Sequence, residues 1–244
     1  MAGSCASETR TRMISVVIPV FNGAAYIAQA IDSVLAQTMA ADEILVVDDG
    51  SSDSTREIVR RYKHPVRYLA QSNRGAAAAR NLGIRESKGD LLAFLDADDV
   101  WLPEKLALQS AALAEDTSVD LIFCQMVQFR SPELPPDRAS ALFCDEAPHR
   151  ALLCSCLLAR KTAFDRAGLM QEDRKCEFLD WYLRAQETGL RIHFVDSVLV
   201  KRRIHAGNYS LTNNRDLHRD YLLTLKMSLD RRNARSRATT GGAS

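Results

Sequence analysis

Two clusters of carboxylates each follow a short, mostly apolar stretch of the sequence. The first is Asp48 and Asp49, directly after residues 43–47, and the second is Asp96, Asp98 and Asp99, directly after residues 91–95. Apolar runs of this length are typical of buried strands, and in an open parallel sheet the carboxyl ends of the strands meet along one edge, where ligands bind. Crowded carboxylates repel one another, and a hard divalent cation such as Mg²⁺ or Mn²⁺ relieves the repulsion. The spacing therefore predicts a crevice that binds a nucleoside diphosphate through a divalent cation, the alternative being two strand-end turns with solvated aspartates.

Two arginines lie between these clusters. Arg74 and Arg80 flank the turn at Gly75, and a guanidinium group matches the geometry of phosphate oxygens. Both are candidates for contacts with phosphate or ribose, and solvated helix residues are the alternative.

The elements that would position these side chains alternate regularly in the first half of the chain. The predicted strands are residues 14–18, 43–47, 66–69, 91–95 and 119–124, and the predicted helices are residues 26–37, 54–62, 76–85 and 103–115. Pro19 is expected to end the first strand because it has no N–H, and Ser54 with Glu57 is expected to form a capping box. The alternation predicts a parallel, three-layer α/β sheet.

The pattern changes in the second half of the chain. Residues 130–148 contain four of the seven prolines and predict a long loop that caps a site or contacts a partner. Further strands are expected at residues 151–159, 191–195 and 198–204, and a helix is expected to begin near Cys176.

This last helix carries a charged stripe. Glu177, Asp180 and Arg184 fall on one side of it, while most other positions are apolar. A helix that is apolar nearly all round should be buried, so the stripe should face either a paired network or a site.

Composition excludes several classes of protein. The chain has 244 residues, of which 46% are hydrophobic and 26% charged, and its net charge is +1. We expect a soluble globular protein without a nucleic-acid partner. No apolar run reaches the roughly 18 residues that cross a bilayer, and residues 1–13 lack the apolar core of a signal peptide, so a cytoplasmic location is expected. Residues 1–12 and 238–244 are expected to be a disordered leader and tail.

The six cysteines are scattered along the chain. This favours reduced thiols over a disulfide framework. Cys154 and Cys156 form the one close pair, and the sequence offers neither a second pair nor a histidine at zinc-ligand spacing beside it.

Residues 213–237 predict an amphipathic, basic helix at the C-terminal end. Its apolar positions are Leu217, Tyr221, Leu222, Leu225 and Leu229, and Arg231, Arg232, Arg235 and Arg237 follow. We favour a helix that docks on the domain, and peripheral contact with an anionic membrane is the second interpretation.

Taken together, four blocks of the sequence resemble the family 2 inverting glycosyltransferases of the GT-A fold. The blocks are Ile18-Pro19-Val20-Phe21-Asn22, Val46 to Asp53, Asn73-Arg74-Gly75 with Ala79-Arg80-Asn81, and Phe94 to Asp99. Weaker similarity continues through residues 177–189 and through Arg203, His205, Asn208 and Ser210. The resemblance implies a Rossmann-like α/β/α sandwich with a mostly parallel central sheet, in which residues 13–125 would bind a nucleotide sugar and residues 126–212 an acceptor.

The resemblance also implies a role for each site residue. Pro19, Phe21, Asn22, Asp48 and Asp49 would line the pocket for the donor nucleoside, most often uridine. Asp96, with Ala97 beside it, would face ribose or sugar hydroxyls, and Asp98 would hold Mn²⁺ or Mg²⁺ together with Asp96. His205 would add a metal or pyrophosphate contact, and Arg202 or Arg203 would balance the charge of the diphosphate.

The implied reaction moves a sugar from a nucleoside-diphosphate donor, most often a UDP-sugar, to an acceptor with inversion. The acceptor attacks the anomeric carbon opposite the leaving diphosphate, the metal neutralises that group, and a carboxylate takes the acceptor proton. Nothing in the sequence tells whether the acceptor is a glycan, a lipid, a peptide or a small molecule.

At the catalytic base the sequence departs from the family pattern. Members commonly have Glu-Asp at the start of the charged helix, with the Asp as base, whereas this chain has Glu177-Phe178. Phe178 cannot accept a proton. Asp180 is the first candidate for the base and Glu177 the second, and the alternative is that Asp180 only forms a buried ion pair with Arg184.

Other classes of function compete with this interpretation. Asp96 to Val100 also fits the Asp-x-Asp-x-(Thr/Val) signature of haloacid-dehalogenase-like phosphatases, with Asp96 as the nucleophile, but that motif normally ends the first strand of its domain. The non-enzyme alternative is a sugar-nucleotide-binding or scaffold protein on the same fold. A Rossmann dehydrogenase is disfavoured because no G-x-G-x-x-G follows the first strand.

Overall fold

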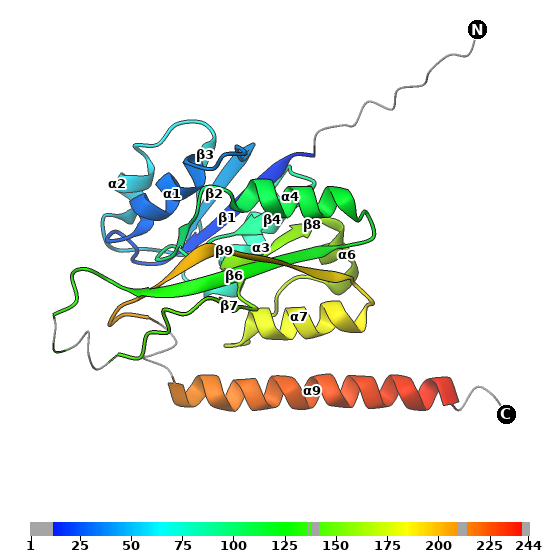
Figure 1. Ribbon diagram of the computed structural model, residues 1–244. Helices are drawn as coiled ribbons and strands as arrows, with labels where there is room; N and C mark the ends of the chain where they lie inside the picture. Colours follow the sequence, from blue (N-terminus) through cyan, green and yellow to red (C-terminus); the bar gives the residue numbers. More distant parts are fainter. Residues whose placement is uncertain (1–11, 136, 138–141, 209–213, 241–244) are drawn as a thin grey trace, which may run out of the picture.

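The computed structural model describes residues 12–135, 137, 142–208 and 214–240 (Figure 1). The predicted leader, except for Arg12, the last four residues of the predicted tail and Ser210 lie outside these described residues.

The described residues form one mixed sheet of nine strands. The strands are β1 Ile14–Val20, β2 Glu43–Asp48, β3 Val66–Ala70, β4 Leu91–Phe94, β5 Val100–Trp101, β6 Leu121–Arg130, β7 His149–Arg150, β8 Leu158–Arg160 and β9 Ile192–Ile204. Their order is β3-β2-β1-β4-β8-β6-β9-β5, and β7 pairs with β6. The predicted parallel pairing holds for β3, β2, β1 and β4 and for β6 with β9, whereas β8 is antiparallel between β4 and β6.

Helices cover both faces of this sheet. They are α1 Ile27–Leu35, α2 Thr55–Val59, α3 Ala76–Glu86, α4 Lys105–Glu115, α6 Thr162–Ala167, α7 Glu177–Glu187 and α9 Asn214–Thr240, with a 3₁₀ turn, η1, at Cys154–Cys156. Figure 1 shows α4 on one side of the sheet, α7 on the other, and α9 beyond α7. None of the helices in the described part of the chain combines the length and the apolar character that a membrane crossing requires.

The core lies around the strands that carry the acidic clusters. β1, β2 and β4 are buried along their whole length, as expected for strands covered on both faces. α3 packs against β1 and β2, and a Cβ added at Gly83 would collide with Val17. The close approach of α3 to β1 places Arg80 at the carboxyl ends of the strands.

Some of the predicted boundaries were wrong. Pro19 does not end the first strand: it pairs with Val47 inside β1, and the next residue, Val20, still accepts a hydrogen bond from the Asp49 N–H at 2.8 Å. The predicted capping box is absent because Ser54 makes no side-chain cap. Instead Asp53 accepts hydrogen bonds from the Thr55 backbone and hydroxyl at 3.0 and 2.5 Å.

The second half differs more from the sequence-based prediction. The predicted strand over residues 151–159 contains the short turn η1 at Cys154–Cys156, and β8 begins only at Leu158. Two strands were predicted over residues 191–204, but the structure has one long strand, β9. The break in the apolar pattern coincides with irregular pairing between β9 and β6, opposite Cys124 to Met126. α9 continues to Thr240, so residues 238–240 are helical rather than part of a disordered tail.

Candidate active site

A pocket of about 1120 Å³ opens at the carboxyl ends of β1, β2 and β4. Of the residues singled out from the sequence, Pro19, Phe21, Asn22, Asp49, Arg74, Arg80, Asp96, Ala97, Asp98, Glu177 and His205 line it. The two acidic strand ends therefore face one cavity, as the parallel sheet predicted. Asp48, Asp180 and Arg203 are not among the lining residues.

Asp49 closes the loop that forms one wall of this pocket. Its carboxylate accepts hydrogen bonds from the Gln71 side chain at 2.7 Å and from the backbone N–H groups of Arg74 and Gly75 at 2.9 and 2.7 Å. Gly75 has φ +93°, a backbone conformation that glycine adopts without strain. Asp49 thus shapes the wall that contains Arg74.

Asp48 has a different role from the one predicted. Its side chain is buried and accepts hydrogen bonds from the Tyr68 hydroxyl at 2.6 Å and the Ser51 N–H at 2.8 Å. Burial, together with the neighbouring Asp48 carboxylate, raises the pKa of Tyr68 to about 12. Asp48 is not among the lining residues of the pocket, and its hydrogen bond to Tyr68 supports the link between β2 and β3.

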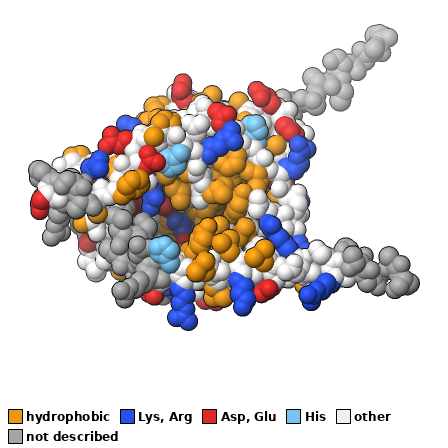
Figure 2. Space-filling model, turned by 60° about the horizontal axis from the view of Figure 1, so that its bottom comes forward, with side chains coloured by type: hydrophobic (Ala, Val, Ile, Leu, Met, Phe, Trp, Pro, Cys, Tyr) orange, Lys and Arg blue, Asp and Glu red, His pale blue; other side chains and the backbone are white. Residues whose placement is uncertain are grey.

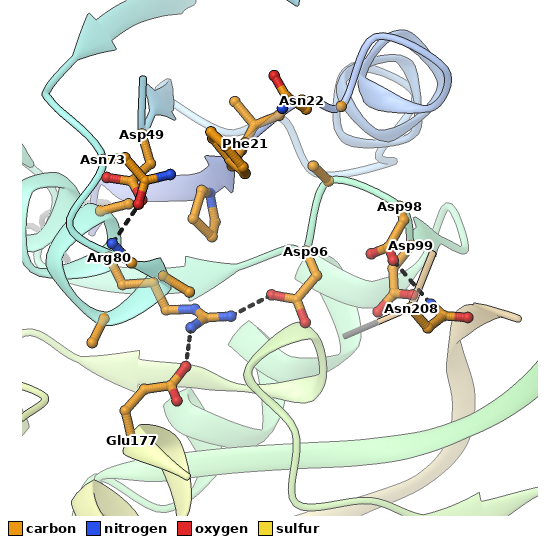
Figure 3. A pocket seen from close by; sticks show the side chains of 18 of the residues that line it. Phe21, Asn22, Asp49, Asn73, Arg80, Asp96, Asp98, Asp99, Glu177 and Asn208 are labelled. Carbon is orange, nitrogen blue, oxygen red and sulfur yellow. Dashed lines mark hydrogen bonds and ion pairs between the residues drawn. The ribbon is translucent and has the colours of Figure 1, made fainter. Parts of the chain in front are cut away.

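Arg80 joins the two sides of the pocket (Figure 3). Its guanidinium group donates to Asp96 Oδ1 at 2.6 Å and to Glu177 Oε1 at 2.7 Å. The Arg80 side chain is buried, whereas that of Asp96 is about one third exposed, at 35%. A single buried cation therefore fixes one carboxylate at the end of β4 and a second at the start of α7.

Asp98 belongs to a second group of polar side chains. Its Oδ2 lies 3.0 Å from His205 Nε2 and accepts a hydrogen bond from Asn208 Nδ2 at 3.1 Å. Asn208 also accepts a hydrogen bond from the His205 N–H at 2.6 Å. The turn after β9 is thus locked in a form that points its imidazole at the second aspartate of the Asp-x-Asp motif (Figure 3 labels Asp98 and Asn208).

Asp99 and Ser155 form hydrogen bonds that fix the backbone of the Asp-x-Asp turn. The Ser155 hydroxyl donates to Asp99 at 2.8 Å and accepts from the Asp96 N–H at 3.1 Å. Burial raises the pKa of Asp99 well above its usual range, and repulsion from Asp98 and Asp96 raises it further. Sequence reasoning missed Ser155, although a polar residue between two cysteines inside an apolar stretch was a signal for it.

Arg203 also supports this turn and does not face the pocket. Its N–H donates to Asp99 at 3.1 Å and its Nε to the Asp98 carbonyl at 2.9 Å. Its guanidinium lies 4.7 and 4.6 Å from the ring centres of Tyr26 and Phe129. Because the guanidinium group of Arg203 is turned inward, it is not placed to neutralise a diphosphate in the pocket. Its neighbour Arg202 lines the pocket instead.

Asp180, the first candidate for the base, lies in the protein interior. It is 1% exposed, Arg184 Nε donates to it at 2.8 Å, and Arg231 lies 3.8 Å from its other oxygen. An acceptor in the pocket has no access to this buried ion pair, so the geometry removes Asp180 from the candidate bases. Glu177, the second candidate, lines the pocket.

Few side chains of the described residues are placed to ligate a metal ion. The described residues contain no group of three or more His, Cys, Asp or Glu side chains arranged to hold a metal, and Asp96 is turned toward Arg80. Asp98 and His205 remain as a pair of oxygen and nitrogen donors 3.0 Å apart. Mg²⁺ is commonly bound by one or two carboxylates together with substrate phosphates, so this pair fits an ion that a diphosphate helps to hold.

Solved structures of glycosyltransferases have a similar fold. S. aureus TarS 1-349 in complex with UDP-GlcNAc matches with a TM-score of 0.70 at 20% identity, over 87% of this chain and 65% of that chain. The mannosyltransferase PcManGT from Pyrobaculum calidifontis, in complex with GDP-Man and Mn²⁺, matches with a TM-score of 0.64 at 22% identity, over 84% of this chain and 60% of that chain. These similarities define the class of protein: the chain has the GT-A fold of glycosyltransferases.

Sequence comparison gives the family. Residues 15–164 match Glycosyl transferase family 2. An uncharacterized glycosyltransferase of Rickettsia prowazekii is 33% identical over 219 residues, which are 82% of this chain and 66% of the relative. One of Nostoc sp. is 44% identical over 97 residues, 38% of this chain and 30% of the relative. The chain belongs to glycosyl transferase family 2, and it spans just under two thirds of the length of the Rickettsia relative.

Family membership decides one of the alternatives. In the dehalogenase-like interpretation the Asp-x-Asp motif would normally end the first strand, but Asp96 and Asp98 follow β4 in a family 2 chain. That interpretation was therefore wrong.

Proposed function

We propose that this protein transfers a sugar from a nucleoside-diphosphate donor, with UDP-sugars as the first donors to test, to an acceptor with inversion at the anomeric carbon. The observation that carries the proposal is the single pocket that contains Asp49, Asp96, Asp98 and Glu177. The complexes of TarS with UDP-GlcNAc and of PcManGT with GDP-Man support a nucleotide sugar as the donor.

The donor would occupy the side of the pocket formed by the ends of β1, β2 and β4. Pro19 and Phe21 offer apolar surface to a base, and Asn22 and Asp49 offer polar atoms beside it. Asp96 is oriented by Arg80 and partly exposed, which suits hydrogen bonds to hydroxyls of the ribose or the sugar. Arg74 and Arg202 line the same cavity and would face the diphosphate.

Asp98 and His205 would hold Mn²⁺ or Mg²⁺. When bound, the ion supplies Lewis acidity that neutralises negative charge on the leaving diphosphate. Asn208 donates to the same carboxylate oxygen that faces His205, and this bond keeps the carboxylate oriented toward the pocket.

Glu177 is our candidate for the base. It lines the pocket at the start of α7, and Arg80 donates to its Oε1, which fixes the carboxylate in place. Its oxygen would take the proton of an acceptor hydroxyl as the new glycosidic bond forms, and the leaving diphosphate departs with the electrons of the broken bond. A cytoplasmic site of action stays a prediction.

The test combines binding and turnover. We expect UDP-GlcNAc, UDP-glucose or GDP-mannose with Mn²⁺ to raise the melting temperature by roughly 5 °C when the ligand is about 100-fold above Kd. Slow hydrolysis of the same donor should release nucleoside diphosphate. Asp98→Asn should abolish the part of the shift that needs Mn²⁺, while Asp165→Asn, at an exposed position of α6 outside the pocket, should leave it unchanged. The absence of any shift with all three donors would contradict the proposal.

A nucleotide-sugar-binding protein without turnover is the second candidate. The observation that favours it is Phe178, whose ring lies 6.2 Å from Phe123 and 6.0 Å from Trp181 in an apolar cluster. Phe178, the residue after Glu177, therefore packs against other aromatic rings. Donor binding with no release of nucleoside diphosphate, with or without candidate acceptors, would support this second function.

A further inference from the structure

The helix α9 contacts the domain through its polar side. Thr224 and Ser228 are buried there, Ser228 donates to Glu187 of α7 at 2.8 Å, and Arg231 donates to Glu187 at 2.7 Å. Arg231 also lies 3.8 Å from the buried Asp180. This contact is more polar than usual, because an amphipathic helix of a soluble domain normally turns its leucines inward, although Leu225 does pack against the core here.

Three leucines of α9, Leu222, Leu223 and Leu229, are exposed. Leu222 is 67% exposed and Leu229 is 58% exposed. These two residues are seven positions apart, and so lie within about 20° of each other around the helix, whereas Arg231 is nine positions from Leu222 and lies on the opposite side. Tyr221 and Leu223 are also exposed, at 47% and 45%. A patch of this kind normally marks a surface that something covers.

Basic side chains border this apolar strip. At about 100° per residue, Arg219, Lys226 and Arg232 lie within a quarter turn of Leu222, and Asp230 lies on the same side. All four are exposed. Basic side chains project along the lower edge of Figure 2, where α9 runs, with hydrophobic side chains beside them. The outer side of α9 is therefore both apolar and net positive.

A second copy of the chain is a poorer match for this surface than a lipid surface. A paired coiled coil would use Leu222, Leu225 and Leu229 as its seam, but the next seam positions are Arg232 and Ser236. Apolar residues must persist over three to four heptads for a stable seam, and here they stop after about one. Charges of one sign on both copies would also repel.

We propose that the outer face of α9, formed by Tyr221, Leu222, Leu223 and Leu229 with Arg219, Lys226 and Arg232, is a contact surface for anionic membranes. The leucines would enter the boundary between headgroups and acyl chains, and the basic side chains would meet the acidic headgroups. The opposite face of α9 stays on α7 through Glu187 and Asp220. This binding needs no catalytic turnover, so it can be tested separately from the proposed transfer reaction.

The experiment measures sedimentation of the protein with lipid vesicles. We expect binding to vesicles of phosphatidylcholine with roughly one third phosphatidylserine, little binding to pure phosphatidylcholine, and a loss of binding as salt rises. Leu222→Ser with Leu229→Ser should weaken binding by about tenfold or more, and Lys226→Gln with Arg232→Gln by a similar factor. Leu108→Ser is the matched control, because Leu108 is 38% exposed on α4, on the other side of the sheet.

Three results would overturn the proposal. The first is equal sedimentation with both kinds of vesicle, and the second is equal sedimentation of the double leucine variant and the unchanged protein. The third is a dimer in light scattering that becomes a monomer in the double leucine variant, because the strip would then be covered by a second copy. Since all the substituted side chains are exposed, circular dichroism should report the same helix content for every variant.

Discussion

At the scale of single residues, the site depends on one buried arginine. Arg80 donates to Asp96 after β4 and to Glu177 at the start of α7, so the positions of the two carboxylates depend on each other. Charged hydrogen bonds of this kind are short and directional. The next residue, Phe178, cannot accept a proton, and Glu177 is the carboxylate at the start of α7 that lines the pocket.

Substitution of Glu177 tests its assignment as the base. Glu177→Gln keeps a hydrogen-bond acceptor for Arg80 but cannot take a proton, so we expect kcat to fall by about 10²–10⁴ while the thermal shift with donor and Mn²⁺ persists. Asp180→Asn, one turn further along the same helix, should instead lower the melting temperature because Arg184 loses its charged partner. Turnover of Glu177→Gln at the rate of the unchanged protein would place the base elsewhere.

At the scale of elements, α9 organises the start of α7. Asp220 on α9 accepts hydrogen bonds from the backbone N–H groups of Lys175 and Cys176, both at 2.8 Å. It also lies 3.4 Å from the guanidinium of Arg174. The turn held in this way lines the pocket and leads directly to Glu177. A helix far along the chain thus supplies the cap that the first turn of α7 lacks, since Cys176 makes no side-chain cap.

Removal of this carboxylate should affect both stability and function. Asp220→Ala leaves two backbone N–H groups without their acceptor, and we expect the free energy of unfolding to fall by about 1–2 kcal/mol. We also expect kcat/KM to fall because Glu177 follows the loosened turn. Asp216→Ala is the control, as an exposed acid on the same helix. Equal stability and activity of the two variants in urea unfolding and donor turnover would show that the cap does not matter.

At the scale of the whole molecule, a buried polar network joins strands at the end of the sheet away from the pocket. Ser15 of β1 and the Lys88 N–H both donate to Glu43 of β2, at 2.7 and 2.5 Å, and Arg67 of β3 donates at 2.8 Å. The Gly89 N–H in turn donates to the Ser15 hydroxyl at 2.8 Å. A Cβ at Gly89 would lie 2.5 Å from that hydroxyl oxygen, so glycine is required for this close approach.

The network makes stability depend on pH. Burial alone would raise the pKa of Glu43, but the hydrogen bonds from Lys88, Ser15 and Arg67 outweigh it and hold the pKa below its usual value. A carboxylate with a lowered pKa in the folded state stabilises the protein above its unfolded pKa, near 4.3, and this contribution is lost as the pH falls through the folded pKa.

Glu43→Gln should therefore lower the free energy of unfolding by about 1–3 kcal/mol at pH 7. The difference from the unchanged protein should shrink below about pH 4.3, as measured by urea unfolding across this range. Glu86→Gln is the control, since that carboxylate is half exposed and lies 3.9 Å from Arg67. A difference that does not vary with pH would contradict this account of Glu43.

The sequence by itself determined the features that depend on local pattern. Apolar runs that end in aspartates predicted the strand ends, and the regular alternation predicted the parallel sheet that brings Asp49, Asp96 and Asp98 to one pocket. These predictions held because strand burial and the meeting of strand ends follow from local hydrophobicity and from the geometry of a parallel sheet.

Only the tertiary structure decided which way the other side chains face. Asp180 and Glu177 share a stripe on α7, yet Glu177 reaches the pocket and Asp180 is buried against Arg184. Likewise Arg203 turns inward, and Leu222 and Leu229 of α9 turn outward. The physical reason is that the orientation of a helix or strand end is set by its partners distant in the sequence, here Arg80, Asp99 and Glu187, and a local pattern does not contain those contacts.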